Sequence, residues 1–362
     1  TTLYHLIFVV KIKIIMKVCI IGRGLTSLTL AKTLVDEGIS VDIYANQKAK
    51  SLDRSRTIGI SKSNIKFFNE NILNIKKLLW NINKIEIYSE NFKDNKVLNF
   101  EKNKQNLFSI IKNHELQSCL IKELNKNKLF KTKNMIESKK LLNRNYNLFI
   151  NCDFNSSIAK KFFYKKINKE YNSYAHSLII KHKKKPNNNT AVQIFTEKGP
   201  LAFLPISDQE TSVVFSVKGP QNVNLKNLIK KYNNKYSIIQ IYGNSSFELS
   251  SSNLRTYYND NLLAFGDMLH KLHPLAGQGF NMSIRDIKVL LNLIRFKIRH
   301  GLGLDKSICT DFEKKTKHKN YLFSNGIDFI YEFFNLESKT KNSILSKSVQ
   351  YLGKNKVTNN LF

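Results

Sequence analysis

The chain has 362 residues, of which 42% are hydrophobic, so it is long enough for about two domains with a substantial buried core. Its four cysteines are widely spaced, which excludes a disulfide framework and favours buried thiols. The formal net charge is +32, but the lysines are scattered and accompany no nucleic-acid-binding motif, so we expect no nucleic-acid partner. A basic surface of this kind favours contact with anionic lipid.

Residues 1–15 precede the first methionine and do not fit the pattern that follows. Their apolar run is too short to span a bilayer and no cleavage site follows it. We interpret them as a non-core N-terminal extension, with Met16 as the natural start. No apolar run of 18 residues occurs elsewhere, so any membrane contact is expected to be peripheral.

The first predicted unit is a strand–helix–strand. A buried strand at residues 17–21 is followed by Gly22-Arg23-Gly24, an amphipathic helix and a second strand at 41–44. In such a unit a glycine-rich turn lets the backbone approach a pyrophosphate at a helix N-terminus. Ser27 stands where the motif has its third glycine, so the turn alone is equally compatible with a plain strand–helix connection.

The middle of the chain changes character twice. Residues 64–140 are rich in Lys and Asn and are predicted to be helical, with a possible strand at 84–88. Short strands with brief turns are then predicted at 177–180, 191–196, 201–205 and 212–217. This regular spacing indicates an antiparallel sheet.

A second glycine motif lies in the last third. A short strand at 262–265 leads into Gly266-Asp267, and Pro274 and Gly277-Gln278-Gly279 precede a helix with apolar residues spaced 3, 4, 3, 4. An Asp at a strand end can accept hydrogen bonds from a sugar hydroxyl, and glycines at a helix start expose backbone N–H groups. Together these features suit a nucleotide cofactor. From about Asp305 the tail is predicted to be helical, and the apolar stripe at 323–334 indicates core packing or, alternatively, a membrane-touching face.

At this point the chain resembles the FAD-dependent aromatic-ring hydroxylases, and among them the ubiquinone-biosynthesis monooxygenases. The signature G-D-x-x-H-x-x-H-P-x-A-G-Q-G-x-N runs from Gly266 to Asn281, and Asp286 follows where the family has Asp. Residues 53–61, 193–205 and 323–325 resemble three further family segments in the same order.

The resemblance implies an α/β fold: a discontinuous Rossmann-like FAD-binding domain, an inserted antiparallel β-sheet substrate domain and a helical C-terminal region. We expect the FAD-binding domain at 16–165 and 254–304, the substrate domain at 166–253 and the helical region at 305–362. The sheet insertion would separate the two halves of the cofactor site.

The resemblance also implies the site residues. Expected cofactor contacts are Gly22, Gly24, Leu25, Ser27, Arg56, His114, Asp153, Gly266, Asp267, Gly277, Gln278, Gly279 and Asn281. Expected substrate contacts are Phe203, Pro205, His273 and Pro274, although strand alternation allows only one of Phe203 and Leu204 to face the site. We name no catalytic acid or base. Asp267 could instead cap its turn, and Arg56 could be a surface charge.

Three departures bear on cofactor affinity. Ala45 replaces the acidic residue that usually ends the second strand, Phe154 follows Asp153 in place of a glycine, and His114 stands where an Arg is usual. His270 and His273 invite a metal site, but Pro274 and the glycines break any helix that would align them, so we expect no metal.

The implied function is hydroxylation of the aromatic ring of a polyprenylated ubiquinone precursor with O2, through a flavin C4a-hydroperoxide. NAD(P)H or another donor would reduce the FAD, yet no second dinucleotide motif occurs, since Gly301-Leu302-Gly303 follows a helix. Two alternatives stay open: an FAD-dependent reductase or dehydrogenase acting on an isoprenoid, and a flavin-poor scaffold of a quinone-biosynthesis complex. We expect a cytoplasmic protein at a peripheral, anionic membrane surface.

Overall fold

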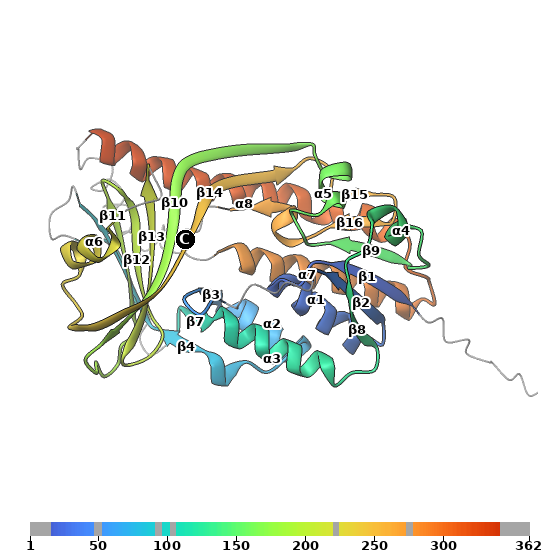
Figure 1. Cartoon of the computed structure of the whole chain (residues 1–362), viewed down its shortest axis with the longest axis horizontal. Coiled ribbons are helices and arrows are strands. Elements are labelled where there is room, and N and C mark those ends of the chain that lie inside the picture. Colours follow the sequence, from blue (N-terminus) through green and yellow to red (C-terminus); the bar gives the residue numbers. More distant parts are fainter. Residues whose placement is uncertain are drawn as a thin grey trace, which may run out of the picture.

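The computed structural model describes residues 16–46, 53–90, 96–101, 106–219, 224–272 and 278–340. Two sheets stand at opposite ends of the long axis, and a smaller sheet and several helices lie between them (Figure 1). The fold is the expected one: a Rossmann-like domain made of two separated parts of the chain, an inserted sheet domain and a helical C-terminal region.

The Rossmann-like sheet has six strands in the order β15-β16-β9-β1-β2-β8. Their bounds are β1 (Lys17–Ile21), β2 (Ser40–Ala45), β8 (Phe130–Asn134), β9 (Leu148–Asn151), β15 (Tyr258–Asn259) and β16 (Leu262–Ala264). All neighbours are parallel except β15 and β16. Because β16 pairs with β9, the late glycine motif is brought to the same sheet edge as the early one.

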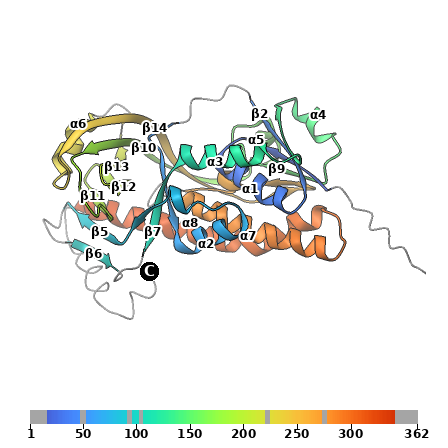
Figure 2. The same cartoon turned by 90° about the horizontal axis from the view of Figure 1, so that it is seen from below.

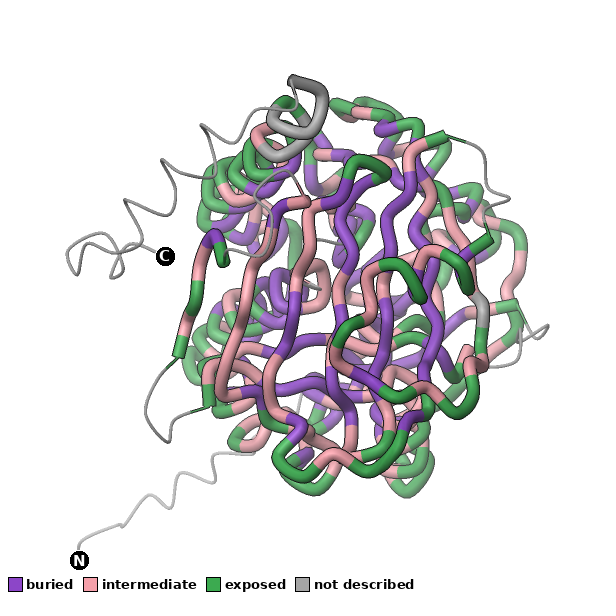
Figure 3. Tube along the Cα trace, turned by 90° about the vertical axis from the view of Figure 1, so that its left-hand side faces the viewer, coloured by how far each residue is buried: buried purple, intermediate pink, exposed green. Residues whose placement is uncertain are grey.

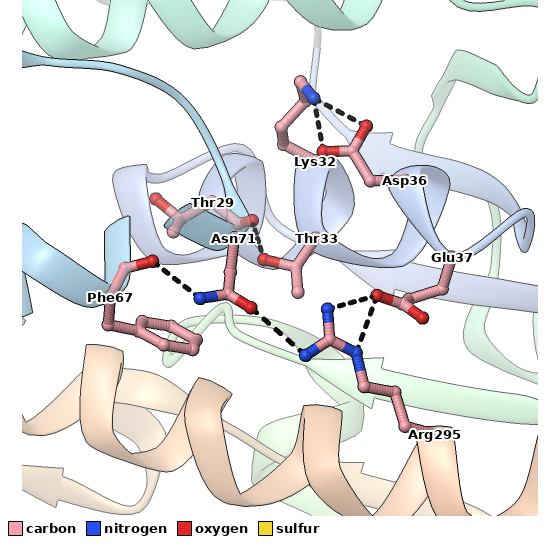
Figure 4. A network of polar contacts seen from close by, with 8 residues as sticks. All are labelled: Thr29, Lys32, Thr33, Asp36, Glu37, Phe67, Asn71 and Arg295. Atoms are coloured by element: carbon pink, nitrogen blue, oxygen red, sulfur yellow. Dashed lines mark hydrogen bonds and ion pairs between the residues drawn. The ribbon is translucent and has the colours of Figure 1, made fainter. Parts of the chain in front are cut away.

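Helices cover this sheet and connect its two parts. They are α1 (Leu25–Asp36), α2 (Lys62–Asn71), α3 (Asn113–Asn125), α4 (Ser138–Leu142), α5 (Ser157–Phe162) and α7 (Gln278–Arg299). Arg295 of α7 donates to Glu37, just after α1, at 2.7 Å and to Asn71 at the end of α2 at 3.1 Å (Figure 4). This contact ties the late helix to two early ones.

The second large sheet has eight strands in the order β17-β14-β10-β13-β12-β11-β5-β6. Their bounds are β5 (Lys84–Ser89), β6 (Lys96–Glu101), β10 (Lys166–His182), β11 (Thr190–Thr196), β12 (Gly199–Pro205), β13 (Glu210–Lys218), β14 (Ile238–Leu254) and β17 (His270–Lys271). The four strands predicted from periodicity are confirmed as β10 to β13. The sheet is antiparallel except that β11 and β5 are parallel.

The two faces of this large sheet have different partners. One face, here called the α6 face, is covered by α6 (Leu225–Tyr232), and Figure 3 looks onto this side of the molecule. The other face, here called the small-sheet face, packs against a three-stranded sheet of β3 (Thr57–Ser61), β7 (Phe108–Lys112) and β4 (Trp80–Ile82).

The middle of the chain departs from the predicted helical character. Among its described residues only α2, α3, α4 and the short 3-10 helix η1 (Lys76–Leu78) are helical, whereas β4 to β8 are strands. In β5, Lys84 and Glu86 alternate with Ile85 and Ile87, and β6, which starts at Lys96 and ends at Glu101, forms the edge of the sheet. These two strands belong to the large sheet, although the boundaries we expected placed them in the FAD-binding domain.

The tail forms one long helix, α8 (Lys306–Thr340), as predicted from about Asp305. Figure 2 shows it beside α7, and Asn320 of α8 donates to Asp286 of α7 at 3.1 Å. Phe312 of α8 packs against Phe265, at the end of β16, with ring centroids 5.5 Å apart. The tail therefore buttresses the Rossmann-like domain.

Candidate cofactor site

The glycine-rich turn after β1 is built to accept an anion. Gly22 has φ +103°, which only glycine adopts without strain, and its N–H donates to Tyr44 O at 2.9 Å. Gly24 caps α1 with no side-chain hydrogen bond, and a Cβ there would meet nothing within 4 Å. The first turn of α1, which contains Leu25 and Ser27, carries no acidic residue. Its free N–H groups and positive dipole end therefore remain available to a phosphate.

Asp153 lies beside this turn. A Cβ on Gly22 would stand 3.2 Å from the Asp153 Cβ, so the space between β1 and β9 admits only glycine at position 22. One carboxylate oxygen of Asp153 accepts the Asn155 N–H at 2.9 Å. The half-buried side chain thus keeps its place even though Phe154 replaces the family glycine.

The late motif reaches the same place. Gly266, in the 3-10 helix η2 (Gly266–Met268), has φ +66°, and a Cβ there would lie 2.9 Å from Cγ2 of Thr26 in α1. Asp267 follows with its side chain exposed. Cys152 lies near both Asp267 and Asp153, and burial raises the pKa of its thiol to about 12, so it is a neutral packing group. The structure therefore brings the two sequence motifs together.

The start of α7 is only partly described. Gln278 and Gly279 open the helix, its first turn has no acidic residue, and a Cβ at Gly279 would meet nothing within 4 Å. His273, Pro274 and Gly277 lie outside the described residues.

The side chain of Asn281 joins α7 to β3 and α2 through hydrogen bonds. Its side-chain oxygen accepts from Ser61 N at 3.0 Å and from Asn64 Nδ2 at 2.8 Å, and its own Nδ2 donates to Gly59 O at 2.7 Å. The amide expected to contact the cofactor instead fastens α7 to β3 and α2. This role depends on long-range contacts and has no local sequence signal.

Arg56 and His114 occupy neighbouring segments, since Asn113 N donates to Arg56 O at 3.0 Å. The Arg56 guanidinium is exposed and lies over the Phe247 ring, 5.3 Å from its centroid. Burial lowers the pKa of His114, the second residue of α3. Gln117 of the same helix donates to Arg23 O at 3.4 Å, so this end of α3 lies near the glycine-rich turn.

The structure corrects the expectation that Phe203 and Pro205 contact the substrate. Phe203 is buried on the α6 face, where it packs near Tyr236. Pro205 pairs with Thr211, whose hydroxyl contacts His182 on that same face. Leu204 points to the small-sheet face, toward Trp80 and Phe108. Strand alternation allowed one of the two neighbours to face the cofactor domain, and it is Leu204 rather than Phe203.

His270 has a role that the sequence did not reveal. Its Nε2 lies 2.7 Å from Asp286 Oδ2, and both side chains are buried. Removing either partner would leave the other polar group buried and uncompensated. The pair joins β17 to α7 on either side of the glycine loop. In the described residues no cluster of metal-ligating side chains occurs, and His270 is engaged by Asp286.

These residues fit FAD. The N-terminus of α1 and the carboxylates Asp153 and Asp267 follow the carboxyl ends of the parallel strands β1, β9 and β16. The start of α7 adds a second helix N-terminus without an acidic first turn. Gly24 and Gly279 have open space at Cβ. Ala45 is the last residue of β2, so the usual position of the ribose acceptor is indeed apolar.

Comparisons with known proteins agree with this geometry. The model of a family described as "FAD binding domain" matches residues 222–300. The 3-demethoxyubiquinol 3-hydroxylase of Escherichia coli (strain K12) is 27% identical over 152 residues, which is 39% of each chain. The mitochondrial ubiquinone biosynthesis monooxygenase COQ6 of Dictyostelium discoideum is 23% identical over 440 residues, with 94% of this chain and 88% of that protein covered.

Solved structures share the fold. The p-nitrophenol 4-monooxygenase PnpA from Pseudomonas putida DLL-E4 superposes with a TM-score of 0.77 at 10% identity, over 96% of both chains. In the E. coli match, however, the chain spans about two fifths of its relative's length. The chain is thus similar in part of its sequence to an FAD-binding domain and to ubiquinone-biosynthesis hydroxylases, and it shares its fold with FAD-dependent monooxygenases.

Proposed function

We propose that this protein is an FAD-dependent monooxygenase that hydroxylates the aromatic ring of a polyprenylated ubiquinone precursor. The observation that carries the proposal is the meeting of the two glycine motifs at Thr26 and Gly266, beside Asp153. The reaction and substrate class are suggested by the relatives, whose names include a demethoxyubiquinol hydroxylase and ubiquinone biosynthesis monooxygenases.

Each part of the site has a proposed task. The first turn of α1 binds the pyrophosphate through its N–H groups, and Asp267 and Asp153 accept hydrogen bonds from cofactor hydroxyls. The start of α7, at Gln278 and Gly279, directs N–H groups toward the flavin ring and stabilises negative charge there. Bound FAD, reduced by NAD(P)H or another donor, supplies the activation of O2.

The proposed setting is a peripheral, cytoplasmic site on an anionic membrane, within reach of a quinone-biosynthesis complex. The net charge of +32 favours such a surface. Among the helices of the described ranges, none combines the length and apolar character needed to cross a bilayer.

Cofactor binding is tested with the Asp267→Ala variant. Loss of a charge-assisted acceptor is expected to weaken FAD binding by about 1.5–3 kcal/mol. Asp260→Ala is the matched control, because Asp260 is an exposed carboxylate near Lys306, away from both glycine motifs. If the wild-type protein takes up no flavin from excess FAD, the proposal that it is an FAD-dependent enzyme is refuted.

Reaction type is tested in cells that lack a ring hydroxylase of ubiquinone synthesis. We expect restored quinone with one ring oxygen derived from labelled O2, measured by mass spectrometry. Gly277→Val is expected to abolish the rescue, because the resemblance implies that this glycine contacts the cofactor and a bulkier residue would displace the flavin. Flavin-loaded protein that restores no quinone at any hydroxylation position would favour the isoprenoid-reductase alternative.

A further inference from the structure

A cavity of about 730 Å³ lies away from the cofactor site. It is a groove open to solvent, lined by α8, the start of β10, the end of β14 and β15, which run together along the top of Figure 1. Ile167, Leu254 and Tyr321 contribute apolar and aromatic surface to its wall, and none of the residues expected to bind FAD or substrate lines it. It therefore needs a different occupant.

The cavity carries unbalanced positive charge. Arg255, Lys314 and His318 line it, and all three are exposed. Within the part of the chain that the structure describes, none of these three side chains makes an ion pair or hydrogen bond. Glu313 is the single carboxylate in the wall, and it is already engaged by Lys317 at 2.7 Å and by the Tyr257 N–H at 2.8 Å. The wall thus carries the positive charges of Arg255 and Lys314 with no free carboxylate beside them.

An exposed apolar surface adjoins the cavity on the same helix. Leu322 and Phe329 are seven residues apart, two helical turns, and their side chains are 57% and 69% exposed. The cavity residue Tyr321 is exposed on one side of this pair and Ile330 on the other side. The two acidic residues nearest this stripe face other partners: Asp328 accepts from Tyr171, and Glu332 pairs with Lys169. The stripe therefore exposes apolar side chains, and the two acidic residues nearest to it are both paired.

We propose that this face of α8 docks on an anionic phospholipid membrane, with a headgroup phosphate bound by Arg255, Lys314 and His318. Leu322, Phe329 and Ile330 would then enter the boundary between headgroups and acyl chains. The charged side chains of Arg255 and Lys314, followed along α8 by exposed apolar side chains, match the order of phosphate and hydrocarbon in a lipid, and Arg can bind a phosphate through two N–H groups. The inference rests on the proposed function, because a polyprenylated substrate resides in the membrane.

The test is flotation of the full-length, FAD-loaded protein with vesicles of phosphatidylcholine alone or mixed with phosphatidylglycerol. The groove variant Arg255→Gln/Lys314→Gln is expected to partition into the anionic vesicles about ten- to thirty-fold less, from roughly five-fold per charge. The stripe variant Leu322→Ser/Phe329→Ser is expected to lose binding to both vesicle types, with an unchanged Tm.

The matched control is Lys128→Gln/Lys131→Gln. It removes the same charge around the start of β8, at the opposite edge of the Rossmann-like sheet from β15. If the control and groove variants lose the same amount of binding to anionic vesicles, the proposed docking face is wrong. Binding would then arise from the overall positive charge of the protein. A stripe variant with a lowered Tm and full vesicle binding would show that another part of the chain or a second copy covers the stripe.

Binding of free glycerol phosphate in the groove by a wild-type protein that floats with neither kind of vesicle would also overturn the proposal, because the groove would then bind a soluble phosphate rather than a membrane. FAD content and hydroxylation of a short-chain, water-soluble phenol are expected to be the same in all four proteins. Loss of these two readouts in the wild type would count against the proposed enzyme and leave the lipid-binding result separate.

Discussion

Thr26 and Gly266 touch across most of the chain: a Cβ on Gly266 would stand 2.9 Å from Cγ2 of Thr26. The contact presses the turn after β16 onto the first turn of α1. It exists only because position 266 has no side chain and a left-handed backbone. Both halves of the proposed FAD site depend on this approach.

Gly266→Ala is therefore expected to lower both stability and FAD affinity. The positive φ alone costs about 1 kcal/mol, and the clash with Thr26 adds to it. Gly301→Ala is the matched control, since Gly301 has φ +67° but a Cβ there meets nothing within 4 Å. Thermal unfolding and FAD titration of the two variants separate backbone strain from the contact. Equal effects on FAD affinity would show that the Thr26 contact is irrelevant to the site.

Ala45→Glu is expected to tighten FAD binding by about 1 kcal/mol through hydrogen bonds to ribose hydroxyls. Ala45 ends β2, the strand parallel to and beside β1, where the carboxylate would stand next to the glycine-rich turn. Ser40→Glu, at the other end of the same strand, controls for added negative charge. An FAD dissociation constant that stays the same or rises would contradict this placement of the ribose.

His176 is expected to make the fold sensitive to acid. Burial lowers the pKa of its imidazole below the usual 6.5, and neither ring nitrogen has a hydrogen-bond partner among the described residues. Because the unfolded chain then binds a proton more readily, the free energy of unfolding falls as pH drops below about 6.5. His176→Leu is expected to flatten this dependence in denaturant titrations between pH 5 and 7.5. His318→Leu, at an exposed site, should keep the wild-type slope, and an unchanged slope in His176→Leu would contradict the assignment.

Alanine variants of Phe203 and Leu204 are expected to distinguish a residue that stabilises the fold from one that contacts the substrate. Phe203→Ala should lower the free energy of unfolding by about 3–5 kcal/mol, because it empties the core under α6, and leave KM unchanged. Leu204→Ala, at a half-buried position on the small-sheet face, should cost less stability and alter KM. The measurements are urea unfolding and steady-state kinetics. A raised KM in Phe203→Ala with little loss of stability would restore Phe203 as a substrate contact.

The local pattern was sufficient for several features. The apolar run at 17–21 and the following glycines predicted β1 and the start of α1, and the 3, 4, 3, 4 spacing after Asn281 predicted α7. These features depend on neighbours within a few residues, because hydrophobic periodicity and turn chemistry act over one or two turns of chain. The resemblance also predicted that the two glycine motifs form one cofactor site.

Tertiary contacts decided the rest. Side chains in β12 alternate between the two faces of the sheet, and the sequence does not say which face is which. Only the packing of α6 shows that Phe203 rather than Leu204 faces away from the cofactor domain. The possible strand predicted at 84–88 is confirmed as β5, whereas β6 carries a weak local signal and is a strand because it pairs with β5. The bonds of Asn281 to β3 and α2, and the buried contact of His270 with Asp286, join residues that only folding brings together. Sequence by itself determined which elements could bind a dinucleotide, and the tertiary structure decided which side chains remain free to do so.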